Sequence, residues 1–459
     1  PSDVMAYYLS KESQLKMHKE TSTALELFMQ MLIDKGEKDG IKENMNVMAG
    51  SGLVGIVKEV GPNYAKVRSI IDDSSQVSAM VSTTKDNFTV SGDLKSMNTS
   101  KVITFSGLRD EDDEVEVVAE VVGGATFAYD YTKKLLERGK SVVTSNKELV
   151  ATHGAELLAI AQEHNCNYLF EASVGGGIPI IRPLNKCLAG NSIEQISGIL
   201  NGTTNFILSK MIKEQMDFAT ALKMAQELGY AEKDPTADVE GHDACRKICI
   251  LGSLAYGKHI YPEMVHCSGI SRITLDDVEY AENAGYAIKL IGSVKPVGDD
   301  KITAIVCPRL VPKTNLLASV DENYNAISVT GDGVGDVLFY GQGAGKLPTA
   351  SAVVGDIIDC LKHHNRVLAL TWEDCHDKEY AVSYKKAEVS MYVRIKADNA
   401  EELKASISEM FGKLMYIERD GRPDDELAFI TPNMVEEDID ANLTILSHSC
   451  EIASKIRLY

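Results

Sequence analysis

The stretch EVEVVAEVVGGATFAYDYTKKLLERGKSVVTSNKELV, residues 114–150, decides the fold class. It opens with the continuous apolar run 114–124, which is typical of a strand buried on both faces. Residues 129–140 form an amphipathic pattern that predicts a helix stopped by Gly139. Residues 141–150 predict a second strand that ends in polar residues. A strand, a helix and a strand in this order predict a β-α-β unit with a parallel sheet.

The patterns on either side of this unit predict further domains. Residues 1–32 are polar, with Met and Leu spaced along one face, and predict a helical lead. Short β-branched runs cut by Gly, Asn and Asp fill residues 33–117 and predict a small β domain, a barrel or a sandwich. Residues 151–339 alternate helices and strands without an obvious linker. Residues 385–459 show a β-α-β-β-α order, which predicts a ferredoxin-like module. The fold class is therefore a multidomain chain of α/β and α+β parts.

Composition excludes several classes of partner. The 459 residues carry a formal net charge of −20, which argues against nucleic acid and against an anionic membrane surface. No apolar run approaches the ~20 residues of a membrane span. The nine cysteines include no C-x-x-C pair. We interpret them as free thiols, which indicates a reducing, cytoplasmic location.

The run Gly50-Ser51-Gly52-Leu53-Val54-Gly55 matches the G-x-G-x-x-G pattern of dinucleotide-binding folds. Asp72 and Asp73 follow at about 20 residues, where an acid that binds a ribose is expected. However, the segment before Gly50 is a poor buried strand, and the residues after Gly55 alternate as a half-buried strand does. We therefore interpret Gly50, Gly52 and Gly55 as turn glycines, with the cofactor site as the alternative.

The segment LGYAEKDPTADVEGHDACRKICILGSLAYG, residues 228–257, is the richest in reactive side chains. Acidic residues crowd its first half, and an apolar helix follows. Asp243 and Lys247 are four residues apart and share one face of that helix. A lysine whose stem is buried beside acids has a shifted pKa and can exchange a proton with a carbonyl oxygen. The alternative is a solvated acidic loop with a surface ion pair.

Three other places are candidates for ligand contacts. The glycines of EASVGGGIPIIRPLN, residues 171–185, indicate a loop that exposes backbone carbonyls or admits a ligand, or a simple tight turn. In FYGQGAGKLPTASAVVGDIID, residues 339–359, a Gly-Ala-Gly turn precedes a long apolar helix whose N-terminus can face a phosphate. Lys147 stands just past a parallel strand, where ligands bind in α/β folds, or is an ordinary surface lysine.

These stretches occur in one order, and from about residue 118 to 359 the chain resembles homoserine dehydrogenase. The resemblance also rests on ILNGTTNFILSKM at 199–211 and on GISRITLDDVEYAENAGYAIKLIG at 269–292. It implies a reversible, NAD- or NADP-linked reduction of L-aspartate 4-semialdehyde to L-homoserine, in threonine and methionine biosynthesis. It also implies a homo-oligomer, a dimer or a tetramer.

The resemblance assigns roles to individual residues. Lys247 resembles the proton donor to the aldehyde oxygen, and Asp243 its partner on the substrate side. Glu232 resembles the residue that holds the substrate amino group, and Asp238 is a second substrate-binding candidate. The positions that resemble the nucleotide site are Gly123, Lys147, Gly229 and Gly345. The backbone carbonyls that resemble the family's monovalent-cation site, for sodium, belong to Glu171, Val174, Gly176 and Ile178.

Two further resemblances make the chain look chimeric. Residues 33–116 resemble the rod-shape-determining protein family MreC, in which the Gly50 cluster is a turn of a small β-barrel. Residues 385–459 resemble a degenerate ACT regulatory module. Residues 118–150, completed by 340–362, resemble only part of a nucleotide-binding domain, because the family's opening strand, Gly-rich turn and helix are missing. Residues 151–339 resemble the family's substrate-binding, catalytic and dimerisation domain. The alternative function is a non-catalytic cell-shape scaffold that binds through the MreC-like domain.

Overall fold

A computed structural model describes residues 7–8, 30–33, 35–49, 52–69, 76–80, 87–91, 104–106, 116–298, 300–363, 367–368, 370–375 and 380–459. The chain divides into two compact units, Pro1–Val115 and Glu116–Tyr459. Each unit is described by itself. Among the described residues, no helix combines the length and the apolar character that crossing a membrane requires.

The first unit is built from strands. One sheet has the order β1-β3-β4-β5-β2 and a second has the order β6-β7-β8. The strands are β1 Tyr7–Tyr8, β2 Gln30–Ile33, β3 Asn46–Ala49, β4 Gly52–Val60, β5 Ala65–Ser69, β6 Gln76–Met80, β7 Asn87–Ser91 and β8 Thr104–Ser106. The small apolar core includes Val47, Val57 and Val67. The pairings among the described strands do not close a barrel.

Two expectations for this unit are wrong in part. The helical lead contains strands β1 and β2, because β2 pairs with β5 as the outer strand of the sheet. Gly55 is not a turn residue: it lies inside β4, and a Cβ there would come within 2.3 Å of the Arg68 carbonyl oxygen on β5. Gly52 opens the same strand, so a strand follows the glycine motif instead of the helix that a dinucleotide fold needs. Gly50 and the acid pair 72–73 lie outside the described residues.

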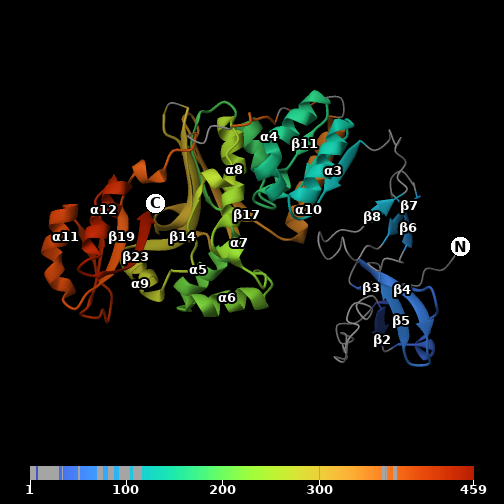
Figure 1. Ribbon diagram of the computed structural model, residues 1–459, viewed down its shortest axis with the longest axis horizontal. Helices are drawn as coiled ribbons and strands as arrows, with labels where there is room; N and C mark the ends of the chain where they lie inside the picture. Colours follow the sequence, from blue (N-terminus) through green and yellow to red (C-terminus); the bar gives the residue numbers. More distant parts are fainter. Residues whose placement is uncertain are drawn as a thin grey trace. The chain divides into compact units, whose positions relative to one another are not determined.

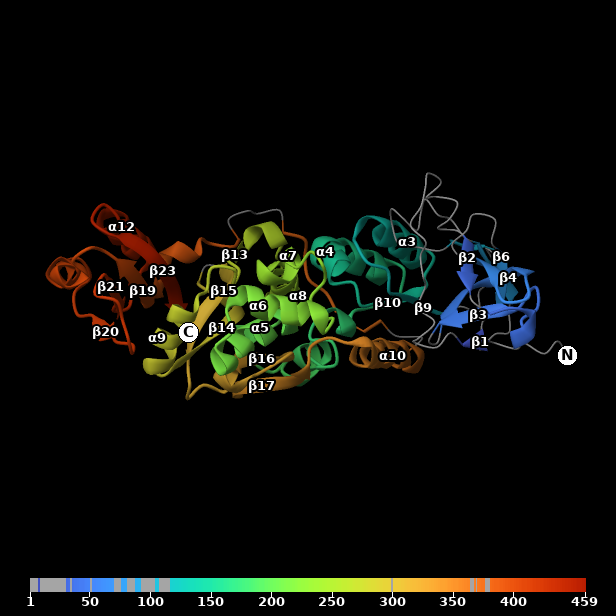
Figure 2. The same cartoon turned by 90° about the horizontal axis from the view of Figure 1, so that it is seen from below.

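The second unit begins with the predicted β-α-β arrangement, whose helix is labelled in Figure 1 and whose two strands are labelled in Figure 2. Strand β9 is Val117–Glu120, helix α3 is Thr126–Glu137 and strand β10 is Ser141–Thr144. Helix α4 (Lys147–Glu163) and strand β11 (Tyr168–Leu169) follow, and the parallel sheet has the order β11-β10-β9. Both predicted strands are shorter than expected. Lys147 begins α4 because Asn146 caps that helix, with its side chain accepting from the Leu149 N–H.

Helix α10 (Lys346–Lys362) starts directly after the predicted Gly-Ala-Gly turn and packs against β9 and β10. Its outward face carries an exposed apolar row, and β9 pairs only with β10 among the described strands. The exposed side chains of this row are Leu347, Val354, Ile358 and Leu361. One edge of the parallel sheet and one face of α10 therefore lack a neighbour among the described residues of the second unit.

The middle of the unit is a mostly antiparallel sheet with helices on one face (Figure 2). Its strands have the order β17-β16-β12-β14-β15, and β13 pairs with β15. They are β12 Ile193–Ile199, β13 His266–Cys267, β14 Tyr286–Pro296, β15 Ile302–Pro312, β16 Tyr324–Gly331 and β17 Gly335–Gln342. Helices α5 and α8 pack against this sheet. The helices of this region are α5 Gly202–Glu214, α6 Phe218–Glu227, α7 Thr236–Val239, α8 His242–Tyr256 and α9 Leu275–Asn283.

The C-terminal module has a β-α-β-β-α-β order with the strands arranged β23-β19-β21-β20. Its elements are β19 Met391–Lys396, α11 Lys404–Phe411, β20 Met415–Ile417, β21 Glu426–Ile430, α12 Glu436–Leu446 and β23 Glu451–Leu458. The sequence prediction stopped at the last helix and missed β23. This strand pairs with β19 and also, in parallel, with β15. The strands of the module therefore continue the central sheet, and the module is not a separate domain.

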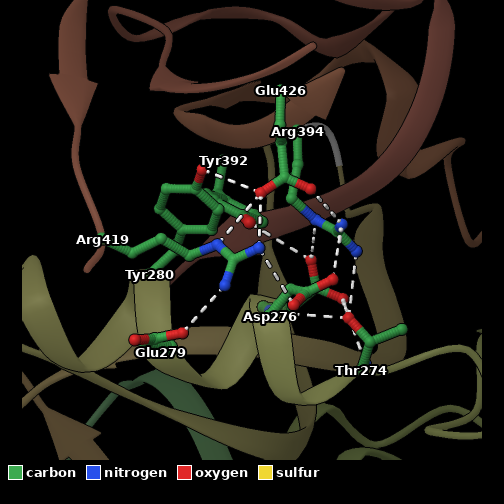
Figure 3. A network of polar contacts seen from close by, with 9 residues as sticks. Thr274, Asp276, Glu279, Tyr280, Tyr392, Arg394, Arg419 and Glu426 are labelled. Carbon is green, nitrogen blue, oxygen red and sulfur yellow. Dashed lines mark hydrogen bonds and ion pairs between the residues drawn. The ribbon is translucent and has the colours of Figure 1, made fainter. Parts of the chain in front are cut away.

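A buried ionic network also joins the module to helix α9 (Figure 3). The Arg394 guanidinium donates to Asp277 and Glu426 at 2.9 Å each and to Asp276 at 3.1 Å. Arg419 reaches Glu426 at 3.0 Å. Because Asp276 and Asp277 belong to α9 and the other residues belong to the module, these bonds cross the junction.

Candidate active site

Helix α8 brings the two predicted proton-transfer residues into the protein interior. The helix starts after Gly241 (φ 84°) and ends at Gly257 (φ 74°), both in the left-handed conformation that glycine adopts most easily. It packs on β12, β14 and β15. Asp243 and Lys247 are only 4% and 7% exposed. The alternative of a solvated surface pair is therefore wrong.

The Lys247 ammonium is held by two acceptors. Its Nζ lies 2.8 Å from Asp243 Oδ2 and 2.7 Å from the Leu200 carbonyl oxygen. An ammonium has three N–H donors, and the third has no acceptor in the described part of the chain. Burial lowers the pKa of Lys247 from its ordinary value of 10.5, and the nearby Asp243 carboxylate opposes that shift. One donor is thus left for an external oxygen.

Asp243 is shared between two lysines. Lys147 Nζ lies 2.6 Å from Oδ1 of the carboxylate, and Lys247 contacts Oδ2. Burial by itself raises the pKa of the Asp243 carboxyl, but the charges of Lys247 and Lys147 outweigh burial and hold this pKa well below its usual range. The carboxylate therefore stays ionised. Lys147, which the sequence assigned to the nucleotide site, contacts the proton-transfer pair directly.

Asn201 ties this pair to a second acid. Its Nδ2 donates to Asp238 Oδ1 at 2.7 Å and to Asp243 Oδ2 at 2.9 Å, while its Oδ1 caps α5 by accepting from the Thr204 N–H at 2.8 Å. An amide with two N–H donors facing two carboxylates has only one orientation that fits. Burial, with the nearby Asp243 charge, raises the pKa of Asp238, although the Asn201 bond opposes the shift.

Glu232 differs from these residues because it is exposed. It lies in the loop between α6 and α7, and its backbone carbonyl accepts from Gln226 Nε2 at 3.0 Å. Its carboxylate has no hydrogen bond or ion pair within the described residues. The structure therefore brings Lys247, Asp243, Asp238 and Lys147 together but records no contact between them and Glu232.

The loops at the carboxyl ends of β9 and β10 are fastened to each other. Asn146 Nδ2 donates to the carbonyls of Val122 and Gly124 at 2.8 Å each. The buried Glu120 carboxylate accepts from the Thr144 hydroxyl at 2.5 Å and from the Val122 N–H at 2.7 Å. Gly123 sits in this loop with open space around its Cα, since a Cβ there would meet no atom within 4 Å. This is the strand end where ligands bind in parallel α/β sheets.

The other nucleotide-site candidates lie at helix ends. Gly345 (φ 119°) is the N-cap of α10, the helix that packs on β9. Gly229 (φ 76°) follows the C-terminus of α6, where its N–H donates to the Gln226 carbonyl at 3.1 Å. The structure places Gly123 and Gly345 at elements that pack together, and Gly229 on a separate element.

The candidate cation site is a buried loop. Glu171, Val174, Gly176 and Ile178 are all buried, and Gly176 has a φ of 56°. The carbonyl oxygens of Val174, Gly176 and Ile178 accept no hydrogen bond within the described residues. Buried carbonyls are nearly always paired, so three unpaired ones in one loop match the chemistry of an oxygen-bound cation. The Glu171 carboxylate is occupied by the N–H groups of Ile180 and Ile181.

Sequence reasoning missed three residues of this region: Asn201, Glu120 and Asn146. A signal existed for two of them, because an Asn directly before a predicted helix is a typical N-cap. No signal existed for Glu120, since its partner Thr144 comes from the next strand.

The described residues define an α/β protein with a parallel sheet and a buried Lys–Asp pair. Lys147, at the start of α4, contacts the aspartate of this pair. The family model described as "Homoserine dehydrogenase" matches residues 179–358. The homoserine dehydrogenase of Corynebacterium glutamicum is 40% identical over 345 residues, covering 73% of this chain and 78% of that protein. The chain therefore belongs to the homoserine dehydrogenase family.

Other relatives agree over shorter or similar spans. The homoserine dehydrogenase of Neisseria gonorrhoeae is 49% identical, covering 54% of this chain and 56% of that protein. A crystal structure of the Thiobacillus denitrificans enzyme has a TM-score of 0.68 and 36% identity, covering 76% of this chain and 83% of that chain. A crystal structure of the S. aureus enzyme has a TM-score of 0.63 and 34% identity, and the match covers 76% of this chain and 82% of that chain.

A second family model matches the N-terminal part of the chain. This model, described as "Rod shape-determining protein MreC, barrel core", matches residues 21–157. This match starts before the predicted boundary at residue 33 and runs past the division between the two units at Val115 into helix α4.

Proposed function

We propose that this chain interconverts L-homoserine and L-aspartate 4-semialdehyde with NAD or NADP as the hydride carrier. The observation that carries the proposal is the buried Lys247 ammonium, which has two protein acceptors and one N–H left over. In the reducing direction that N–H points its proton at the aldehyde oxygen and neutralises the growing alkoxide. Asp243 and the Leu200 carbonyl fix its direction.

The remaining charged residues serve the substrate. An amino-acid substrate has an ammonium group that needs a carboxylate partner. The exposed Glu232 carboxylate has no hydrogen bond or ion pair among the described residues and can take this role. Asp238 is held by Asn201 beside the proton-transfer pair and supplies a second anionic contact. Lys147, 41% exposed at its side chain, links the nucleotide side of the site to Asp243.

The nucleotide fits the loops after β9 and before α10. The open space at Gly123, the loop fastened by Asn146 and the 17-residue helix that begins after Gly345 are suited to a dinucleotide phosphate. When bound, the nicotinamide supplies or accepts the hydride. The unpaired carbonyls of Val174, Gly176 and Ile178, together with Glu171, would hold a sodium ion that stiffens the loop next to Gly343.

The first test is NADPH and NADH formation by the purified chain with saturating L-homoserine at alkaline pH. We expect turnover that Lys247→Ala abolishes, with a loss of at least about 10²-fold, typical of removing a general acid–base group. Lys223→Ala is the matched control, since Lys223 is a surface lysine of α6 with 77% side-chain exposure. Unchanged turnover in Lys247→Ala, or none in the folded parent chain, contradicts the proposal.

The pH profile of homoserine oxidation gives a second test. In this direction the neutral Lys247 amine takes the hydroxyl proton, so the rate rises as pH increases through the pKa of Lys247. Burial lowers that pKa from 10.5, so the midpoint of the rise lies below this value. A midpoint at or above pH 10.5 would show that another group is the base.

The MreC match over residues 21–157 favours a second candidate function, a binding module in the N-terminal unit. This candidate predicts that the full chain forms larger assemblies than the chain lacking residues 1–115, measured by sedimentation velocity. We further propose a cytoplasmic location and an oligomeric enzyme. The nine cysteines support the location, because none of them forms a disulfide in the described part of the chain.

A further inference from the structure

A small cavity lies where the central sheet meets the C-terminal module. It measures about 90 Å³. Side chains alternate between the two faces of a strand. Gly292 and Val306 face helix α8, since a Cβ at Gly292 would lie 3.5 Å from Ile248. Ser293 and Thr303 therefore point to the opposite face, into this cavity, and the module closes it with Tyr384 and Glu388, among others.

Two polar groups that line the cavity have no partner. Thr303 is 7% exposed, and its hydroxyl forms no hydrogen bond within the described residues. The buried Nε–H of Arg309 is equally unpaired, while its Nη2 donates to Ser293 Oγ at 2.8 Å. Buried polar groups without partners are rare and costly in folded proteins. The Thr303 hydroxyl and the Arg309 Nε–H are therefore two unpaired groups that line the same cavity.

Arg309 also lacks a carboxylate partner within the described part of the chain. The neighbouring Arg457 shows the contrast, because its Nε and Nη2 bind both oxygens of Glu436. Glu436 is thus already used. The Arg309 guanidinium therefore lines the cavity as a cation without an ion pair among the described residues, although Glu388 and Glu436 also line the cavity.

The lining chemistry selects the ligand class. A guanidinium edge beside hydroxyl groups is the arrangement that recognises a carboxylate. A cavity of about 90 Å³ is several times smaller than the ~300 Å³ at which sites for drug-sized ligands begin, so a nucleotide does not fit. Glu388 at the module side offers an acceptor for an ammonium group. A simple carboxylate and a small amino acid share the group that Arg309 binds.

We propose that this cavity is a binding site for a small carboxylate ligand of about two to four carbons, held by Arg309 and Thr303. The carboxylate accepts from the Arg309 Nε–H and from the Thr303 hydroxyl. Because sheet and module both line the cavity, the bound ligand also fastens the module to the catalytic sheet. This site is separate from Lys247 and does not depend on the proposed enzyme activity.

The experiment is calorimetric titration of the full chain in a buffer free of carboxylates, at constant ionic strength. The probes are acetate, propionate, glycine and L-alanine, with chloride as the inorganic anion. We expect saturable binding of at least one carboxylate, weakened about 10-fold or more by Arg309→Gln and several-fold by Thr303→Val. Tighter glycine than acetate identifies an amino-acid site, and equal affinities identify a simple carboxylate site.

Matched controls separate binding from folding. Arg272→Gln removes an exposed arginine outside the cavity, and Thr132→Val removes another buried, unpaired hydroxyl, in α3. Both are expected to bind as the parent chain does. The proposal is overturned if no carboxylate binds the folded parent chain, if chloride competes equally, or if Arg309→Gln binds unchanged. Circular dichroism confirms that each variant is folded.

Discussion

At the scale of single residues, burial gives ionisable groups their character. Lys247 and Asp243 form an ion pair inside the protein, and Lys147 adds a second cation beside the same carboxylate. Replacing either partner leaves the other buried and uncompensated, which is why such pairs are costly to break.

A second buried lysine gives a prediction for stability. Lys289 on β14 is fully buried, with Nζ 2.5 Å from the Val320 carbonyl oxygen and 3.2 Å from Asn205 Oδ1. Burial lowers the pKa of Lys289 from 10.5 to about 8, against the pull of Asp321. Between these values the unfolded chain binds more protons than the folded chain, so the unfolding free energy rises with pH. The gain is roughly 3 kcal/mol in total.

Lys289→Met is expected to lack this rise. The measurement is urea unfolding of both proteins from pH 7 to pH 10, compared as a difference so that other titrating groups cancel. Lys295→Met, on the exposed end of the same strand, is the control and keeps the slope of the parent chain. An identical slope in Lys289→Met contradicts the prediction.

At the scale of elements, two helix-capping asparagines also position residues of the candidate active site. Asn146 caps α4 and also holds the loop Val122–Gly124, while Asn201 caps α5 and also bridges Asp238 and Asp243. One amide therefore ends a strand–helix connection and fixes a neighbouring loop at the same time.

Asn146→Ala is expected to lower the unfolding free energy by about 1–2 kcal/mol, the cost of a lost cap and of two unpaired carbonyls. It also raises the KM for the nucleotide, because the loop at Gly123 is released. Asp217→Ala removes the cap of α6 and is the matched control. It loses similar stability without changing the KM. Equal KM values for Asn146→Ala and the parent chain would separate this loop from nucleotide binding.

At the scale of the whole second unit, the C-terminal module is attached by strand pairing and by charge. β23 continues the central sheet from β15, and Arg394 forms a buried network with Asp277 and Glu426 (Figure 3).

Removing the Arg394 guanidinium leaves the carboxylates of Asp277 and Glu426 buried without this cation. Arg394→Met is therefore expected to cost about 3–5 kcal/mol in urea unfolding. Arg422→Met, which breaks ion pairs with two exposed glutamates, costs less than about 1 kcal/mol. Similar losses in the two variants would refute a special role for the buried network.

The sequence by itself determined the local structure and the chemical inventory of this protein. The apolar runs around residues 117 and 142 predicted the parallel β-α-β unit, and the spacing of Asp243 and Lys247 predicted that they share a helix face. These features depend on periodicity and on neighbours within a few residues, which a sequence displays directly.

Only the tertiary structure decided the contacts between distant segments. The interior position of Gly55 follows from the approach of β5, the meeting of Lys147 with Asp243 follows from the packing of α4 on α8, and β23 became visible through its pairing with β15. The same holds for Asn201, whose partners lie 37 and 42 residues away. The physical reason is that sheet pairing and side-chain burial depend on which surfaces meet, and no local pattern encodes that meeting.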